Sequence, residues 1–446
     1  MQEIAPVDDR LSTPTGIRIK RLRQERHLTQ KALADLAGLS YSTVTKTEKA
    51  LIPLTPHVTA CIARALRVDV AAITGQPYYT ELRQDELDVL IRPIREALDV
   101  YDLGADPDVH PRPYEQLDGE TEELLGLVRA GEIKRVAGRV AALVQEVTTL
   151  AHRIGSTEGW SRLARTYRTA YDVSSKRGFG DLAALSLARM DWAAQRASCA
   201  VVSSMHRYMR ALTYLREGQY RTGERLMRLG LDTLGQAEPG RERDVVTGQL
   251  HLGSAVMAGR ARDAEAAGTH LDEAERIARG TGAATRVHWL SFGPTNVAVH
   301  RVSVAAELDD YGRAARDGAR ITFPAGWPAS RRSPHYAELA RALVWTGDLS
   351  GAFTHLLAAR KAAPQQARYH ATVRETYAAL EAAKRQLPAS FLSYGSWLGA
   401  GGGGVREWCP TGRGPVRGWR YGPGPRGTAV PPRPHSPAAR PYRLVP

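Results

Sequence analysis

The sequence predicts an all-α protein with a small N-terminal domain, a long α-solenoid of helical repeats and a C-terminal tail. Apolar residues recur at helical spacing through most of the chain, and turn residues interrupt them at intervals of 37 to 51 residues. The chain has only five Phe within a hydrophobic fraction of 43%, so Ala and Leu must supply most of its core. That composition favours packed helices over a β-sandwich, and 446 residues have room for about two or three domains.

The first domain is expected at residues 15–76, after a loose polar arm at residues 1–14 that contains two Pro. The block is rich in Ala and Leu and has room for five short helices. Its flanking helices are expected to build the core from Ile17, Ile19, Leu22, Val58, Ile62, Ala63, Leu66, Val68, Val70 and Ile73.

The centre of this block predicts two short helices joined by a tight turn. Thr29 is suited to cap the first helix, whose inward face contains Leu33 and Leu36. Gly38 suits a turn that lets the second helix cross the first, and Ser40 is a suitable cap for that second helix. This is the outline of a helix-turn-helix.

The second helix of the pair has Val44 as its one strongly apolar position. A helix so poor in apolar residues must face a wet surface, and short hydroxyl and Lys side chains suit the major groove of DNA. The residues expected to face DNA are Tyr41, Ser42, Thr43, Thr45, Lys46 and Lys49. The alternative is that Tyr41 packs on the protein surface and that Lys46 and Lys49 are ordinary solvated charges.

Over residues 17–75, the chain resembles the lambda-repressor-like, Cro/repressor-type family of DNA-binding domains, also called the xenobiotic-response-element type. The residues that carry the resemblance are Arg23, Leu28-Thr29-Gln30, Leu33-Ala34, Gly38, Ser40, Val44, Glu48, Pro56, Ile62-Ala63 and Ala65-Leu66. The resemblance implies a five-helix domain in a sequence-specific transcriptional regulator, with double-stranded DNA as partner and a homodimer as the binding form.

The resemblance also implies roles for individual residues. Gln30 would bind a DNA phosphate at a helix N-terminus. Arg23 would pair with Glu48 and fix the recognition helix. Tyr41, Ser42, Thr45 and Lys46 would point toward base edges or the nearby DNA backbone. Lys49 would lie near a phosphate. The chain departs from the family at Ala32, where an acidic residue is frequent, and at Ala50, where Gly usually ends the recognition helix.

Residues 77–119 are expected to connect the first domain to the rest. Apolar residues at helical spacing over 81–101 predict a connecting helix, bent or broken near Pro93. Residues 104–119 are rich in Pro, Gly and Asp and predict a hinge.

Residues 120–387 are expected to form the repeat domain. Its turn signals are Gly180-Asp181, Gly218-Gln219-Tyr220, Gly259-Arg260, Asp309-Asp310-Tyr311 and Gly347-Asp348. A single helical hairpin cannot bury its own apolar face, so such units stack. The intervals resemble those of tetratricopeptide-like repeats, and the body resembles the sensor halves of many two-domain regulators. By analogy with peptide-sensing regulators, a peptide or small molecule is the expected effector.

Within this body, Asn296 and Arg301 follow a Gly-Pro break and are candidate ligand-binding residues of the concave face. The favoured alternative is that Asn296 and the neighbouring His300 make contacts between repeats.

Residues 388–446 are expected to be a disordered tail rich in Gly, Pro and Arg. An equally good explanation of the abrupt change in composition is out-of-frame translation of a GC-rich gene, so the tail is given no function. The tail holds eight Arg and one Glu, whereas residues 1–80 hold 11 Lys or Arg and seven Asp or Glu. The net charge of +14 is therefore weaker support for DNA binding than the motif itself.

No pattern in the sequence predicts an enzyme. The 13 His lack HExxH spacing, no GxSxG or GxxxxGK[ST] motif occurs, and the three Cys lie far apart, so no metal or cofactor is expected. No signal pattern or 18-residue apolar run occurs, which predicts a cytoplasmic protein without a membrane partner. The alternative function is a protein-interaction scaffold that uses the repeats and whose helix-turn-helix no longer binds DNA.

Overall fold

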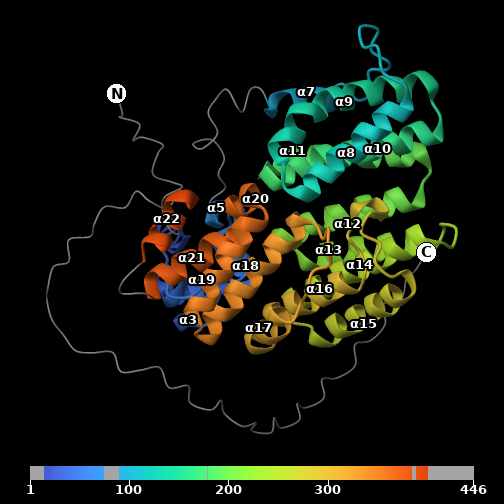
Figure 1. Cartoon of the computed structure of the whole chain (residues 1–446). Coiled ribbons are helices and arrows are strands. Elements are labelled where there is room, and N and C mark those ends of the chain that lie inside the picture. Colours follow the sequence, from blue (N-terminus) through green and yellow to red (C-terminus); the bar gives the residue numbers. More distant parts are fainter. Residues whose placement is uncertain (1–14, 75–89, 178, 384–387, 400–446) are drawn as a thin grey trace, which may run out of the picture. The chain divides into compact units, whose positions relative to one another are not determined.

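A computed structural model describes residues 15–74, 90–177, 179–383 and 388–399 of the chain (Figure 1). These ranges are helical almost throughout, and none of them contains a β-strand. An isolated antiparallel bridge joins Ala284 and Phe292. The prediction of an all-α protein with an N-terminal helix-turn-helix and a helical-repeat region is confirmed.

The N-terminal domain is a bundle of short helices around its own core. Its helices are α1 (Thr15–Glu25), α2 (Gln30–Ala37), α3 (Tyr41–Glu48), α4 (Pro56–Leu66) and α5 (Val70–Thr74). The buried core residues are Ile19, Leu33, Ala34, Val44, Leu54, Ile62, Ala63, Leu66 and Ile73. Because this core is separate from those of the repeat region, the domain has its own source of hydrophobic stabilisation.

Side-chain caps fix where α2 and α3 begin. The Thr29 hydroxyl accepts a hydrogen bond from the backbone N–H of Ala32 at 3.0 Å, and the Ser40 hydroxyl accepts one from Thr43 at 3.0 Å. Gly38 ends α2 with φ of 65°, in the left-handed region. The predicted caps and turn are therefore confirmed.

Leu36 corrects the expected inward face of α2, since 62% of it is exposed. The buried residues of this helix are Leu33 and Ala34, which lie 100° apart around the helix axis. Leu36 lies 60° to the other side of Leu33, so the turn of the helix points it into solvent. Ile17 of α1 is likewise 45% exposed rather than part of the core.

The connection between the domain and the repeats is only partly described. Residues 75–89, which include the first part of the expected connecting helix, lie outside the described residues. Helix α7 (Arg92–Asp99) begins with Pro93 in its first turn, where a missing N–H leaves no helical hydrogen bond unmade. Its residues Ile94 and Leu98 are buried in the core of the repeats, and α7 packs against α9 (Ile133–Ile154).

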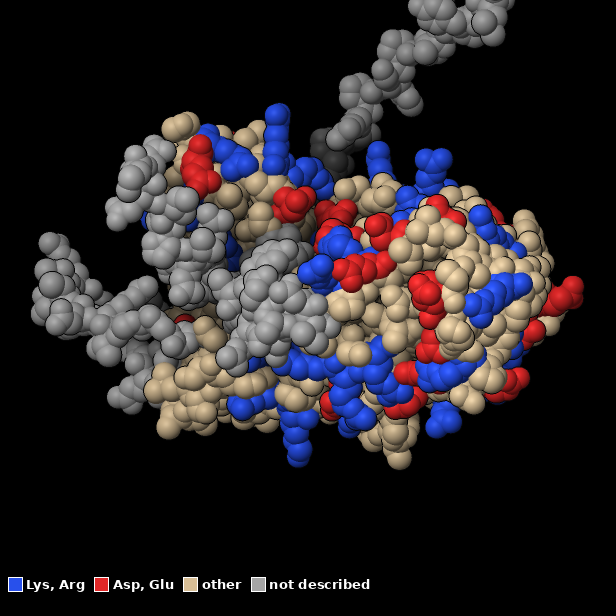
Figure 2. Space-filling model, turned by 90° about the horizontal axis from the view of Figure 1, so that it is seen from above, with Lys and Arg blue, Asp and Glu red and all other residues tan. Residues whose placement is uncertain are grey.

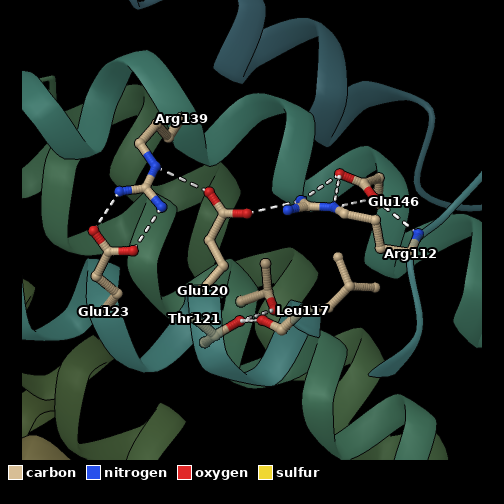
Figure 3. Close-up of polar contacts among 8 residues, drawn as sticks. Arg112, Leu117, Glu120, Thr121, Glu123, Arg139 and Glu146 are labelled. Atoms are coloured by element: carbon tan, nitrogen blue, oxygen red, sulfur yellow. Dashed lines mark hydrogen bonds and ion pairs between the residues drawn. The ribbon is translucent and has the colours of Figure 1, made fainter. Parts of the chain in front are cut away.

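The expected hinge at 104–119 is tied to the repeats by charged contacts (Figure 3). Its last residues belong to α8 (Tyr114–Ala130). Arg112 donates hydrogen bonds to Glu146 of α9 at 2.6 Å and to Glu120 of α8 at 2.7 Å. Glu120 also accepts a bond from Arg139 of α9 at 3.0 Å, so one carboxylate joins both arginines. This network attaches the segment before α8 to the first helical hairpin.

Hairpins of consecutive helices build the rest of the body. The helices after α9 are α10 (Thr157–Arg177), α11 (Gly180–Ala197), α12 (Ala200–Arg216), α13 (Tyr220–Leu234), α14 (Arg241–Arg260), α15 (Ala264–Thr281), the short 3-10 helix η2 (Val287–Trp289), α16 (Pro294–Glu307), α17 (Tyr311–Ala319), α18 (Ala329–Thr346), α19 (Leu349–Ala362), α20 (Pro364–Tyr369), α21 (Ala371–Ala383) and α22 (Ala389–Leu398). Each of the five predicted turn signals lies at the junction between the two helices of one hairpin, from α10–α11 to α18–α19.

The first helix of each hairpin belongs to an inner row. Helices α8, α10, α12, α14, α16 and α18 contact one another in that order, and α18 also contacts α8. The odd-numbered helices pack on them as the second helix of each hairpin. On the side facing away from the second helix of its hairpin, each inner helix therefore meets side chains of other inner helices.

Helix α22 corrects the expected start of the disordered tail at residue 388. Its residues Phe391 and Tyr394 are fully buried, and the Tyr394 hydroxyl donates to the backbone oxygen of Leu356 at 3.0 Å. These aromatic side chains give residues 389–398 enough apolar surface to pack on α19 and α21, which composition alone did not indicate. The rest of the tail, from residue 400, lies outside the described residues.

Candidate nucleic-acid interface

Helix α3 has one buried and one exposed face. Val44, Thr47 and Glu48 are buried, at the i, i+3 and i+4 spacing of a single helical face. On the other side, 56% of Tyr41 is exposed, and the remaining residues predicted to contact DNA are exposed or half-buried. Those residues are Ser42, Thr43, Thr45, Lys46 and Lys49. The packing of α3 thus leaves a polar surface with two cations open to a ligand.

An ion pair between Arg23 and Glu48 holds α3 against α1. The Arg23 Nε donates to Glu48 Oε1 at 2.6 Å and one terminal nitrogen donates to Oε2 at 3.0 Å. A third bond of 2.6 Å runs from Arg23 to the backbone oxygen of Leu28. Both charged side chains are buried, and the hydrogen bond to Glu48 raises the pKa of Arg23. The structure therefore contains the pair that the family resemblance implied.

Gln30 joins the two helices of the motif. Its Nε2 donates to Glu48 Oε2 at 2.7 Å, and its Oε1 accepts from the hydroxyls of Tyr41 and Thr45 at 3.4 Å each. Because Gln30 is the first residue of α2, its backbone lies at a helix N-terminus, which favours an anion. Contact of Gln30 with a phosphate stays a prediction, while its side chain orders the exposed face of α3.

Thr43 has a second role besides the one predicted. Its hydroxyl lies 2.8 Å from the Ser40 hydroxyl, which also accepts the Thr43 backbone N–H. The side chain therefore belongs to the cap of α3 and is half-buried. Tyr41, Ser42 and Lys49 are more exposed and are better placed to reach a ligand.

Two backbone features complete the geometry around α3. Ala50 takes up the left-handed conformation with φ of 52°, which a glycine at this position would adopt without strain. At Gly16, an added Cβ would lie 2.3 Å from the backbone oxygen of Thr47 and 2.8 Å from that of Glu48. Gly16 thus lets α1 approach the end of α3. Sequence reasoning missed Gly16 because no local pattern distinguishes a glycine at a helix crossing.

The charge of the domain is more one-sided than that of the whole chain. Residues 15–74 contain ten Lys or Arg and four Asp or Glu, and one of those four is the buried, paired Glu48. On the face of the protein shown in Figure 2, Lys and Arg are interspersed with Asp and Glu. The basic excess of the small domain provides a field that attracts an anionic polymer.

The structure does not bring the other two predicted ligand residues together. Asn296 is 1% exposed and donates to Gln249 Oε1 at 3.2 Å, which faces the inner row. Arg301 instead makes ion pairs with Asp272 at 2.8 Å and Glu275 at 2.6 Å on α15. Five residues of an α-helix turn through 140°, so the two side chains leave α16 on different sides. Arg301 therefore joins α15 and α16, and Asn296 contacts another repeat, as the alternative interpretation expected of Asn296.

The described residues contain no cluster of three or more His, Cys, Asp or Glu suited to hold a metal ion. Within the same ranges, no helix has the length and apolarity needed to cross a bilayer.

Comparison with known proteins supports the N-terminal domain. Residues 16–73 match the family model described as a helix-turn-helix domain. No match is found among curated proteins. Among solved structures, the crystal structure of BtubC (BKLC) from P. vanneervenii aligns with 57% of this chain and 93% of its own, at 17% identity and a TM-score of 0.35. The chain thus carries a helix-turn-helix domain, a fold that binds DNA, at residues 16–73.

Proposed function

We propose that this chain is a sequence-specific DNA-binding transcriptional regulator of the Cro/repressor type, with α3 as its recognition helix. The observation that carries the proposal is the exposed polar face of α3, held in place by the buried Arg23–Glu48 pair. A recognition helix must be held in place while it presents polar side chains to DNA, and α3 has both properties.

The repeat body gives the proposed regulator a second function. Stacked helical hairpins provide an extended surface for a ligand or a second copy of the chain. We propose that the tetratricopeptide-like body receives a small effector and joins two copies, so that two α3 helices reach half-sites about one helical turn of DNA apart. Such a protein acts in the cytoplasm, where its DNA is, and the proposal includes no catalytic step.

The test is genome-wide mapping of bound DNA, followed by titration of the purified full chain with the recovered sequence. Replacing Lys46 with Ala should weaken specific binding by about 1–3 kcal/mol if its ammonium group contacts a base. The control is Lys20→Ala, which removes an exposed Lys from α1 in the same domain. It should produce only the small, sequence-independent loss expected of one fewer cation.

Salt dependence separates the proposal from the scaffold alternative. The affinity of a DNA-binding regulator should fall steeply with salt concentration, because bound cations release counterions from DNA. If the full chain binds every duplex weakly at low salt, without preference for the mapped sequence, and captures a partner protein through the repeats, the scaffold function is the correct one.

A further inference from the structure

The inner row of helices contains more buried cations than carboxylates. Arg129 of α8 is 8% exposed and Arg168 of α10 is 2% exposed, while Lys176 of α10 and Arg331 of α18 are half-buried. Asp172 is a carboxylate whose charge acts on Arg129, Arg168 and Lys176 alike, and Arg331 repels all three. Three cations therefore share Asp172, and Arg331 adds to the repulsion among them.

Arg129 and Arg168 have fewer partners than buried charges normally have. Arg129 makes no hydrogen bond or ion pair within the described part of the chain, and its buried Nε is unpartnered. The Nε of Arg168 also lacks a hydrogen-bond partner and lies 4.0 Å from Asp172 Oδ2. Because nearly all buried polar groups in proteins are paired, this arrangement favours an additional acceptor with a negative charge.

The electrostatic effect on each group agrees with that conclusion. The pKa of Arg129 is lowered to about 9, mainly by burial and also by the charges of Arg168 and Arg331, while Asp172 acts in the opposite direction. Burial also lowers the pKa of Lys176 to about 8, with Arg129 and Arg331 as repelling neighbours. Both groups carry a proton at neutral pH, so an anion placed among them would relieve the repulsion.

A cavity of about 180 Å³ opens beside Arg168. Its wall consists of Glu122, Leu125, Arg165, Arg168, Glu242, Arg286, Val287, His288 and Trp289. Of the two acids on the wall, Glu122 pairs with Arg165 and accepts from Trp289 Nε1 at 2.7 Å, while the exposed Glu242 lies 3.5 Å from His288. The cavity therefore presents Arg168, Arg286 and apolar surface, with the carboxylate of Glu242 at its exposed side.

The spacing of residues on α8 and α10 connects this cavity to the interior. Leu125 and Arg129 are one turn apart on α8, and Arg168 and Asp172 are one turn apart on α10, so each pair shares a helix face. Arg168 belongs to both regions, because it lines the cavity and its charge acts on Arg129. A ligand in the cavity can thus contact Arg168, whose charge in turn acts on the buried Arg129.

Neutral polar groups from the next three inner helices complete the interior. Gln249 of α14 donates to the Tyr208 hydroxyl of α12 at 2.7 Å and accepts from Asn296 of α16 at 3.2 Å. Among the described residues, no group forms a hydrogen bond with the Asn296 Oδ1. Tyr208 lies within electrostatic range of Arg129 and Arg168. Asn296, predicted as a ligand residue from sequence, is therefore linked through Gln249 to Tyr208 of another repeat.

The backbone of the cavity wall is also unusual. His288 and Trp289 both have positive φ, at 45° and 52°, and so does Ser291 at 62°. Non-glycine residues in this conformation cost energy and gather at ligand-binding segments. The segment is held by Arg168, which donates to the backbone oxygen of His288.

We propose that the inner helices of the repeat body bind a small organic anion through Arg129 and Arg168, with the carboxylate or phosphate group among the cations and an apolar part against Trp289. Lys176 and Arg331 add positive charge around the anionic group. This inference rests on the proposed function in one respect, because it assigns the chemical class of the proposed regulator's effector. Binding of the anion itself can be tested without DNA.

The test uses the full chain and pairs of probes that differ in charge. Benzoate is compared with benzamide and phenyl phosphate with phenol, each at matched ionic strength in sodium chloride, and inorganic phosphate is added as a bare anion. Binding is followed by calorimetry and by the rise in the temperature of unfolding. An anion should bind and its neutral counterpart should not. The response to the two acids distinguishes a carboxylate effector from a phosphate one.

Three variants identify the site. In Arg129→Met and Arg168→Met, anion affinity should fall by about tenfold or more, because a charged hydrogen-bond donor is lost. In Arg225→Met, which removes an exposed arginine of α13, the affinity should be unchanged. Without ligand, Arg129→Met should be at least as stable as the natural chain, since an unpaired buried charge is replaced by an apolar group of similar size. A purely structural arginine would instead give a destabilised variant.

The outcomes are distinguishable from those of the DNA experiment. If no anion binds the natural chain, or if Arg129→Met and Arg168→Met bind as tightly as Arg225→Met, the proposal is overturned. If the anion binds at this site but leaves operator affinity unchanged, the site stands and its role as the effector site of a regulator does not. Loss of DNA binding in Lys46→Ala bears only on the proposed function.

Discussion

Replacing Glu48 with Ala tests how the recognition helix is held. The change removes the acceptor of both bonds from Arg23, at 2.6 and 3.0 Å, and of the 2.7 Å bond from Gln30 Nε2 that joins α2 to α3. Breaking a buried ion pair by removing one partner costs about 3–5 kcal/mol, because the remaining charge stays buried without compensation. Arg23 keeps its bond to Leu28, which places the expected loss near the lower limit, at about 3 kcal/mol.

That loss is large for a domain of this size. A single small core supplies about 3–5 kcal/mol of stability, so the Glu48→Ala variant should leave the N-terminal domain only marginally folded. We expect amide hydrogen exchange to show lost protection in α1, α2 and α3, while the repeats keep theirs. Denaturant unfolding should show an earlier N-terminal transition, and specific DNA binding should be lost.

Two further variants separate burial from charge. Glu25→Ala breaks the Arg21–Glu25 pair, which has a similar N–O distance of 2.9 Å but lies exposed on α1. This change should cost about 0.5 kcal/mol or less. The double variant Arg23→Met with Glu48→Met replaces the buried pair by apolar groups and should recover most of the lost stability. The reasoning is wrong if Glu48→Ala costs no more than Glu25→Ala or if exchange protection of α3 is unchanged.

Three other changes test the backbone and the buried histidines. Ala50 has positive φ, so Ala50→Gly should stabilise the N-terminal domain by about 0.5–1 kcal/mol in denaturant unfolding. Gly38 also has positive φ, and Gly38→Ala should destabilise the domain by about 1 kcal/mol. Equal effects of the two changes would contradict the conclusion that Ala50 is strained. Gly16→Ala should cost about 1–3 kcal/mol, because its Cβ would lie 2.3 Å from a backbone oxygen of α3, while Gly119→Ala on α8, with no atom within 4 Å, should cost nothing measurable. Burial lowers the pKa of His335 to about 4. Its neutral form therefore stabilises the repeats above pH 6.5, and about 2 kcal/mol of that is lost by pH 5 as the unfolded chain binds a proton. His335→Gln should flatten the dependence of unfolding on pH over that range, and an unchanged slope would show that other groups cause it.

Local chemistry explains why the helix-turn-helix could be predicted. The capping hydroxyls of Thr29 and Ser40 and the left-handed conformation of Gly38 depend on residues within a few positions of one another. The polar face of α3 follows from residue type and the 3.6-residue period. The turns between hairpin helices were predicted for the same reason. Leu36 shows the limit of this reasoning. The buried face of α2 is rotated slightly from the face that the sequence pattern predicts, and this leaves Leu36 in solvent.

The sequence by itself therefore determined the helices, their turns and the residue types on the recognition face, because these depend on contacts between near neighbours. Only the tertiary structure decided which polar residues of the repeats meet. Arg129, Arg168 and Asn296 lie on three inner helices and are separated by up to 167 positions in the chain, so no spacing pattern relates them. Burial, charge repulsion and missing partners arise when those helices pack together. They are the basis of the proposed anion site at Arg129 and Arg168, whereas the sequence predicted ligand residues at Asn296 and Arg301.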